Sequence, residues 1–208
     1  MNLFIDLDGT LLDSKQRLYQ LFNDLIVQSE LTYNDYWSLK YEGLNHHKIL
    51  QEKFGFSIEE ISSFEVSWMK AIESSAYLKL DIPFSGIQEW LALKKSKYNL
   101  YLVTARQSID AVNRQLVECK IYEYFDQILV TEQKKTKEQL IKEANIVLTE
   151  NDWLIGDTGY DVLTARSLSI NSLSVLSGFM SKDSLVKYQP DLILDSIIDF
   201  DKCCKCNI

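Results

Sequence analysis

Short, uninterrupted apolar runs recur along this chain and constrain its fold more than any other feature. The first is Leu3–Ile5, and it ends abruptly in the segment Asp6–Thr10. The later runs are Leu100–Val103, Ile128–Val130, Trp153–Ile155, Leu173–Leu176 and a weaker one at Leu192–Leu194. Continuous apolar runs of this length are typical of strands that are buried on both faces of a sheet.

Helical patterns separate these predicted strands. Apolar residues recur at helical spacing in residues 109–116 and again in residues 162–168. The segment Thr136–Gln139 has the form of a capping box and predicts the start of another helix. Strands that alternate with helices predict an α/β fold in which right-handed crossovers build a parallel sheet.

Residues 14–84 break this alternation. They contain no convincing strand, and residues 36–54 and 58–78 have helical patterns with frequent aromatic side chains. A further apolar stripe at helical spacing is formed by Leu18, Leu21, Phe22, Leu25 and Ile26. Pro83 and Gly86 mark the return to the sheet. We therefore expect a small helical module inserted after the first strand.

The charge of the chain excludes some classes of partner. Lysine and arginine total 22 against 30 aspartates and glutamates, which gives a formal net charge of −8. So acidic a surface argues against a general nucleic-acid binder, but it leaves room for one phosphate site. No apolar run could span a bilayer, and the first residues lack the basic start of a signal peptide. We expect neither a nucleic-acid nor a membrane partner.

The cysteines favour a reducing, cytoplasmic location. Besides Cys119, three of them crowd the C-terminus as Cys203, Cys204 and Cys206, which does not resemble a disulfide framework. This tail could also be read as a metal site. A frayed tail with free thiols is the favoured interpretation, because no second cysteine or histidine cluster completes a tetrahedral site.

Reactive side chains follow four of the predicted strands. In chain order they are Asp6 and Asp8, then Thr104 with Ala105 and Arg106, then Lys134, Lys135 and Lys137, and finally Asp157 and Asp161. Functional sites of parallel α/β sheets lie at the carboxyl edge, so we expect these side chains to lie close together. Clustered carboxylates need a cation among them, and magnesium with oxygen ligands is the usual one. A metal flanked by a lysine and a hydroxyl suits a phosphate group.

The motifs resemble the haloacid dehalogenase (HAD) superfamily, in particular its phosphoglycolate-phosphatase-like hydrolases. The matching pieces are Asp6-Leu7-Asp8-Gly9-Thr10, Leu102-Val103-Thr104-Ala105-Arg106, a lysine before a helix, and Ile155-Gly156-Asp157-Thr158-Gly159-Tyr160-Asp161. Their order and spacing cover nearly the whole chain. The resemblance implies a Rossmann-like core made of residues 1–13 and 85–208, with residues 14–84 as a helical cap.

The resemblance also implies the roles of individual residues. Asp6 would be the nucleophile and a magnesium ligand, and Asp8 the general acid and base, with its backbone carbonyl on the metal. Asp157 would be a further metal ligand, and Asp161 would support the site. The phosphoryl or substrate-binding residues would be Gly9, Thr104, Ala105 and Arg106. An aspartate at position 8 is typical of the phosphatases and phosphomutases of this superfamily.

The motif lysine is less well defined, because Lys134, Lys135 and Lys137 compete and no proline follows. Lys137 is preferred since it begins the capped helix, and Lys135 is the second choice. Each residue type also has an ordinary structural interpretation: Asp-rich turns and Thr104 can cap helices, and lysines can be solvated charges. Other residues that could contact an anionic substrate are Arg17, Lys40, His46 and His47, while the cap aromatics are expected to pack between helices.

The sequence therefore predicts a magnesium-dependent phosphatase. It would hydrolyse a small phosphorylated metabolite through an aspartyl-phosphate on Asp6, and the chain would be a monomer or a homodimer. Two alternatives stay open: a sugar phosphomutase with the same intermediate, and a non-catalytic phosphate-binding regulatory module. The identity of the phosphomonoester does not follow from the sequence, because function lives in the site and not in the fold.

Overall fold

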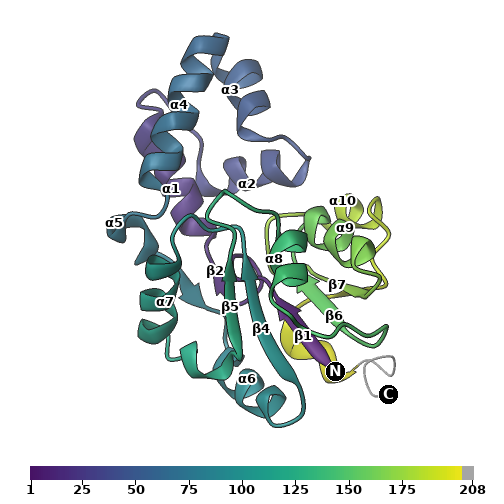
Figure 1. The fold of residues 1–208 in the computed structure, drawn as a ribbon. Coiled ribbons are helices and arrows are strands. Elements are labelled where there is room, and N and C mark those ends of the chain that lie inside the picture. Colours follow the sequence, from purple (N-terminus) through teal and green to yellow (C-terminus); the bar gives the residue numbers. More distant parts are fainter. Residues whose placement is uncertain (203–208) are drawn as a thin grey trace.

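A parallel sheet of six strands forms the centre of the protein in the computed structural model, which describes residues 1–202 (Figure 1). The strand order is β5-β4-β1-β6-β7-β8. The strands are β1 (Asn2–Ile5), β4 (Asn99–Thr104), β5 (Gln127–Val130), β6 (Trp153–Gly156), β7 (Asn171–Val175) and β8 (Leu192–Leu194). Each of the six apolar runs is therefore a strand, and the predicted α/β class is confirmed. The cysteine-rich tail lies outside the described residues.

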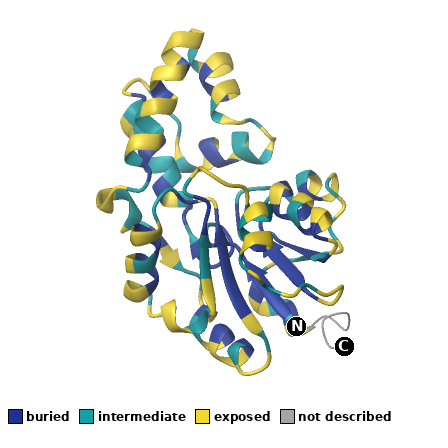
Figure 2. Ribbon diagram, viewed as in Figure 1, coloured by how far each residue is buried: buried dark blue, intermediate teal, exposed yellow. Residues whose placement is uncertain are grey.

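Both faces of the sheet are covered, because side chains alternate along each strand. In β1, Leu3 and Ile5 enter a core with the helices α6 (Ile87–Lys95) and α7 (Ile109–Glu118). Phe4 points to the opposite face and packs with the helices α8 (Lys137–Glu143) and α9 (Gly159–Ser167). The central strands are accordingly buried along almost their whole length (Figure 2). The predicted capping box at Thr136 begins α8.

A separate group of helices lies beyond the carboxyl edge of the sheet (Figure 1). We call α1 to α5 the helical module; its helices are α1 (Lys15–Leu25), α2 (Tyr33–Tyr41), α3 (His46–Phe54), α4 (Ile58–Ala71) and α5 (Ser75–Leu78). The module has its own aromatic-rich core, in which Phe22, Tyr36 and Phe64 are buried. Because Gly43 has a φ of 91° and Asn45 caps α3, the stretch expected as one helix over residues 36–54 is two.

A two-stranded antiparallel ribbon connects the module to the sheet. Its strands are β2 (Leu12–Asp13) and β3 (Ile82–Pro83), with Leu12 opposite Pro83. The expectation that residues 14–84 contain no strand is therefore wrong for β3, which is too short to leave a periodic pattern. The remaining short elements are α10 (Lys182–Val186) and the 3₁₀ turns η1 (Tyr122–Tyr124) and η2 (Ile197–Lys202). None of the helices in residues 1–202 has the length and apolar character needed to cross a membrane.

Candidate active site

The first reactive segment leaves the sheet at the end of β1. The backbone N–H of Asp6 still donates to Ile155 O of the neighbouring strand at 2.9 Å, which aligns Asp6 with the end of β6. The chain then turns at Gly9, whose φ is 76°. A Cβ at this position would lie 2.4 Å from Asp157 Oδ2. Glycine at position 9 thus lets the turn approach Asp157 closely.

Three carboxylates from two strand ends converge beside this turn. Asp6, Asp157 and Asp161 are buried, and each offers an oxygen within 4.8 Å of the others. Lys137, at the first position of α8, bridges two of them: its Nζ lies 2.6 Å from Asp6 Oδ1 and 2.6 Å from Asp161 Oδ1. Asp161 Oδ2 also accepts from the N–H and the hydroxyl of Thr158, so Asp161 is part of a capping box as well. Hydrogen bonds and ion pairs therefore contact the cluster from several sides.

The two competing lysines lie elsewhere. Lys135 pairs with Glu143, and Lys134 Nζ is 3.5 Å from Glu132 with most of its side chain in solvent. Only Lys137, among the three, contacts the carboxylates that follow β1 and β6. The structure thus places the preferred lysine at the candidate site.

The electrostatics of the cluster suit a bound cation. Burial raises the pKa of Asp6 to about 7, although Lys137 opposes the shift. Burial, with Asp6 and Asp161 as neighbours, also raises the pKa of Asp157 well above its ordinary value. Asp157 Oδ1 is buried without a hydrogen-bond partner. Oxygen ligands on crowded carboxylates fit a hard divalent cation, so these residues are suited to hold magnesium.

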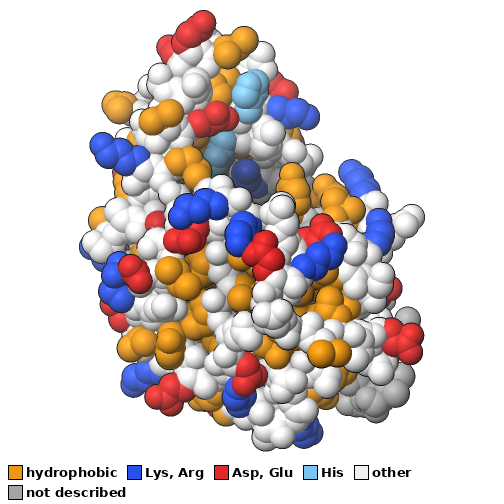
Figure 3. All heavy atoms as spheres, viewed as in Figure 1, with side chains coloured by type: hydrophobic (Ala, Val, Ile, Leu, Met, Phe, Trp, Pro, Cys, Tyr) orange, Lys and Arg blue, Asp and Glu red, His pale blue; other side chains and the backbone are white. Residues whose placement is uncertain are grey.

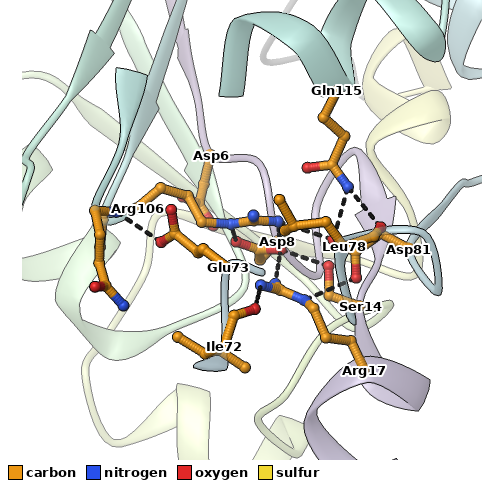
Figure 4. A network of polar contacts seen from close by, with 12 residues as sticks. Asp6, Asp8, Ser14, Arg17, Ile72, Glu73, Leu78, Asp81, Arg106 and Gln115 are labelled. Carbon is orange, nitrogen blue, oxygen red and sulfur yellow. Dashed lines mark hydrogen bonds and ion pairs between the residues drawn. The ribbon is translucent and has the colours of Figure 1, made fainter. Parts of the chain in front are cut away.

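Asp8 lies in a second, separate network of ion pairs (Figure 4). Asp8 Oδ1 is 2.6 Å from Arg17 Nη2 and 2.7 Å from Arg106 Nη2, and it also accepts from the Ser14 hydroxyl. Burial raises the pKa of Asp8, but Arg106 and Arg17 outweigh it and hold this pKa well below its ordinary range. Asp8 is therefore an ionised carboxylate in this state.

The same network contains Asp81, which no motif in the sequence indicated. Asp81 Oδ1 accepts from Arg17 Nε and its Oδ2 from Arg106 Nη2, both at 2.9 Å, and Gln115 Nε2 donates to Oδ2 at 2.9 Å. Its side chain is fully buried. An isolated aspartate before β3 carries no motif, so only the fold reveals that Asp81 holds both arginines in place.

A pocket of about 370 Å³ joins the two networks. It lies between the sheet edge and the helical module, where the molecular surface is hollowed (Figure 3). The predicted site residues that line it are Asp6, Asp8, Thr104, Ala105, Arg106, Lys137 and Asp157. Thr104 ends β4, and the N-cap of α7 is Ser108, so Thr104 is not a helix cap.

Some of the residues considered as substrate contacts do not line this pocket. The amide of Gly9 donates to Leu12 O at 2.7 Å. Lys40 and both histidines belong to the module; His46 Nε2 is 2.7 Å from the Tyr36 hydroxyl inside the aromatic core, and His47 is exposed. Arg17, in contrast, lines the pocket.

A loop after β7 connects the carboxylate cluster to the helical module. The N–H of Phe179 donates to Asp157 Oδ2 at 2.7 Å, and its ring stacks on Trp37 of α2 at 5.6 Å between centroids. A Cβ on Gly178 would lie 2.0 Å from Asp157 Oδ2. The loop therefore fixes one oxygen of Asp157, and no motif in the sequence indicated this role.

The fold and site together place the protein among α/β enzymes that work at the carboxyl edge of a parallel sheet. A model of the haloacid dehalogenase-like hydrolase family matches residues 3–175, which is most of the chain. The chain belongs to this family and is a hydrolase by class. The resemblance seen in the motifs is thereby confirmed.

Relatives cover nearly the whole chain at low identity. Pyrophosphatase PpaX from Bacillus mycoides is 24% identical over 211 residues, covering 93% of this chain and 92% of that protein. A haloacid dehalogenase-like hydrolase from Streptococcus pneumoniae has a TM-score of 0.75 at 25% identity, covering 94% of this chain and 93% of its own. A structure described as a "predicted phosphoglycolate phosphatase" from Haemophilus somnus has a TM-score of 0.72 at 19% identity, covering 96% of each chain.

Proposed function

We propose that the protein is a magnesium-dependent phosphatase that hydrolyses a small phosphomonoester through an aspartyl-phosphate on Asp6. The observation that carries this proposal is the buried cluster of Asp6, Asp157 and Asp161 around Lys137, at one end of a pocket. Asp6 lines the pocket beside Thr104 and Arg106. A carboxylate in this position can attack phosphorus and form a covalent intermediate.

Magnesium would be held by Asp6, Asp157 and Asp161, with the backbone carbonyl of Asp8, and would neutralise charge on the phosphoryl group. The unpaired Oδ1 of Asp157 supports this assignment. Lys137 and Arg106 would add positive charge beside the phosphoryl oxygens, and Thr104 with the amides after it would bind them.

The proton transfers would fall to Asp8. Asp8 is ionised in its ion-pair network, so the proton for the leaving oxygen has to enter with the substrate. Phosphomonoesters carry such a proton at and below their second pKa of about 6, and a minor fraction of them still carries it at pH 7. In the first step Asp6 displaces the leaving group, and Asp8 passes the proton to its oxygen. In the second step Asp8 takes a proton from water as that water releases phosphate from Asp6, and it passes this proton to the phosphate, so that Asp8 is ionised again.

The helical module would act as a cap. We propose residues 14–84 as this cap and residues 1–13 and 85–208 as the core. The ribbon of β2 and β3 carries both chain crossings between them, and Phe179, which lines the pocket, stacks on Trp37 of the module. Opening and closing at the ribbon would control the access of water to the site.

Phosphate release tests the proposal directly. Wild type with magnesium should hydrolyse p-nitrophenyl phosphate, and Asp6→Asn should lower the rate by at least about a thousandfold, because it removes the attacking oxyanion. Circular dichroism should show that the variant is folded. Equal rates for the two proteins, or no release by either, would refute the proposal.

Pyrophosphate is the second candidate substrate. Its support is the relative named as a pyrophosphatase, which aligns over nearly the full length of this chain. The same assay with pyrophosphate decides between the two substrates. A phosphomutase would instead retain the phosphoryl group on a hexose phosphate, and a regulatory module would bind metal and phosphate without turnover.

A further inference from the structure

The two walls of the catalytic pocket differ in chemistry. The wall from the sheet edge carries the carboxylates, Lys137 and Arg106. The wall from the helical module is mainly apolar: Leu18 of α1, Trp68 and Met69 of α4, and Ile72 after α4. The phosphoryl group belongs to the charged wall, so the leaving group of the substrate has to lie against the apolar one.

The apolar wall is a preformed surface. The ring of Trp68 meets His46 edge-on at 4.3 Å between centroids and packs on Phe64 at 5.7 Å, so it is supported from behind by the module core. Met69 is 41% exposed where it faces this open pocket. Exposed apolar side chains around a concave site are typical of a surface that receives an apolar ligand group.

The cations of the pocket are already engaged. Lys137 lies between two carboxylates, and Arg17 and Arg106 are shared between Asp8 and Asp81. Among the described residues, three cations and four carboxylates line the pocket. One of these carboxylates, Glu73, lies at the module side. Asp81 and Asp161, which lie outside the lining, pair with the same three cations, so a second anion on the substrate would meet no free cation of this lining.

The polar groups near the apolar wall are also used internally. Glu73 accepts from the N–H groups of Gln107 and Ser108, and Gln107 Nε2 donates to Met69 O at 3.0 Å. Arg106 Nη1 is the one buried side-chain nitrogen of the described lining without a hydrogen-bond partner. This guanidinium is anchored on Asp8, so it serves the phosphoryl end of the pocket.

We infer that the leaving group of the substrate is an uncharged apolar alcohol, alkyl or aryl, that packs on Trp68, Met69 and Leu18. This inference rests on the proposed phosphatase function and narrows its substrate class. It disfavours pyrophosphate and phosphoglycolate, because burying their second anion against an apolar wall without a counter-charge is costly.

The sharpest test compares two esters that differ only by a remote charge. Benzyl phosphate and 4-carboxybenzyl phosphate share the same ring and the same leaving oxygen. We expect kcat/KM for benzyl phosphate to be at least about tenfold higher, as expected for a pocket that rejects an unpaired charge. Trp68→Ala should raise KM for benzyl phosphate and reduce this ratio, and Met69→Arg should reduce or reverse it. Val66→Ala, at an exposed position of the same helix, should leave the ratio unchanged.

The possible outcomes distinguish a failure of the leaving-group inference from a failure of the proposed phosphatase function. Equal or faster turnover of the carboxylated ester, of pyrophosphate or of phosphoglycolate, lost in Asp6→Asn, would overturn the inference and leave the phosphatase intact. A preference for benzyl phosphate that Trp68→Ala does not change would also overturn it. No Asp6-dependent release from any ester, p-nitrophenyl phosphate included, would overturn the phosphatase itself.

Discussion

The sheet edge and the helical module face each other across one pocket, yet they contribute to it in opposite ways. The sheet edge presents buried charged groups that are held by several hydrogen bonds and ion pairs each. The module presents apolar side chains that rest on an aromatic core, with Arg17 and Glu73 as its charged contributions. Buried charged groups are stable only where hydrogen bonds and ion pairs fix their positions, whereas an apolar surface binds a ligand through the fit of its shape. In the proposed function, the sheet edge supplies the reacting groups and the module supplies the surface that contacts the leaving group.

After the loss expected for Asp6→Asn, the largest effect should come from the lysine of the sheet edge. Lys137→Met removes the cation between Asp6 and Asp161, so we expect activity on p-nitrophenyl phosphate to fall by at least about a hundredfold. Lys135→Met is the matched control, because Lys135 is exposed and pairs with Glu143. Steady-state rates of both variants test this. A larger loss of activity in Lys135→Met than in Lys137→Met would contradict the choice of Lys137 as the lysine of the site.

A large loss of stability is expected where the module and the sheet edge share charges. Asp81→Ala leaves two buried guanidinium groups without one of their carboxylates, and such a break costs roughly 3–5 kcal/mol. Urea unfolding measures it. Glu138→Gln is the control, since it breaks an exposed pair with Lys142 and should leave the unfolding midpoint unchanged. Equal effects of the two variants would show that the Asp81 network does not join the two regions.

A smaller effect is expected at the loop that connects the two regions. In Gly178→Ala the new Cβ would collide with Asp157, so we expect magnesium affinity to fall by about tenfold or more. Titration calorimetry with magnesium measures this without turnover. Gly43→Ala is the control: it strains a positive φ in the module but meets no atom within 4 Å, so it should lower stability without changing magnesium affinity.

The smallest predicted effect is a pH dependence of the sheet edge. The pKa of Asp6 rises from its ordinary 3.8 to about 7 on folding. As pH rises through this window the unfolded chain loses its proton first, so this group makes the metal-free protein less stable. Magnesium needs the ionised carboxylates, so the rise in Tm that it produces should be larger at pH 8 than at pH 5. A larger rise at pH 5 would contradict the assignment of Asp6 as a ligand.

The same contrast explains what the sequence could predict. The residues of the sheet edge follow buried strands, so Asp6, Thr104 and Asp157 could be placed together from the apolar runs alone. The module wall could not, because Leu18 belongs to the stripe of an ordinary packed helix and Trp68 and Met69 lie in a helical pattern. Asp81 and Phe179 act through tertiary contacts and carry no local pattern. Short strands such as β3 could not be predicted either, because two residues are too few to show the alternation of apolar and polar side chains that marks a strand.

Trapping the intermediate tests the central claim most directly. The protein would be mixed with magnesium and p-nitrophenyl phosphate, quenched in acid and treated with borohydride, which reduces an acyl phosphate to an alcohol. Mass spectrometry of the peptide that contains Asp6 should then show homoserine at position 6, and wild type without substrate should not. Phosphate release that leaves Asp6 unmodified, or that modifies another residue, would contradict the attack by Asp6.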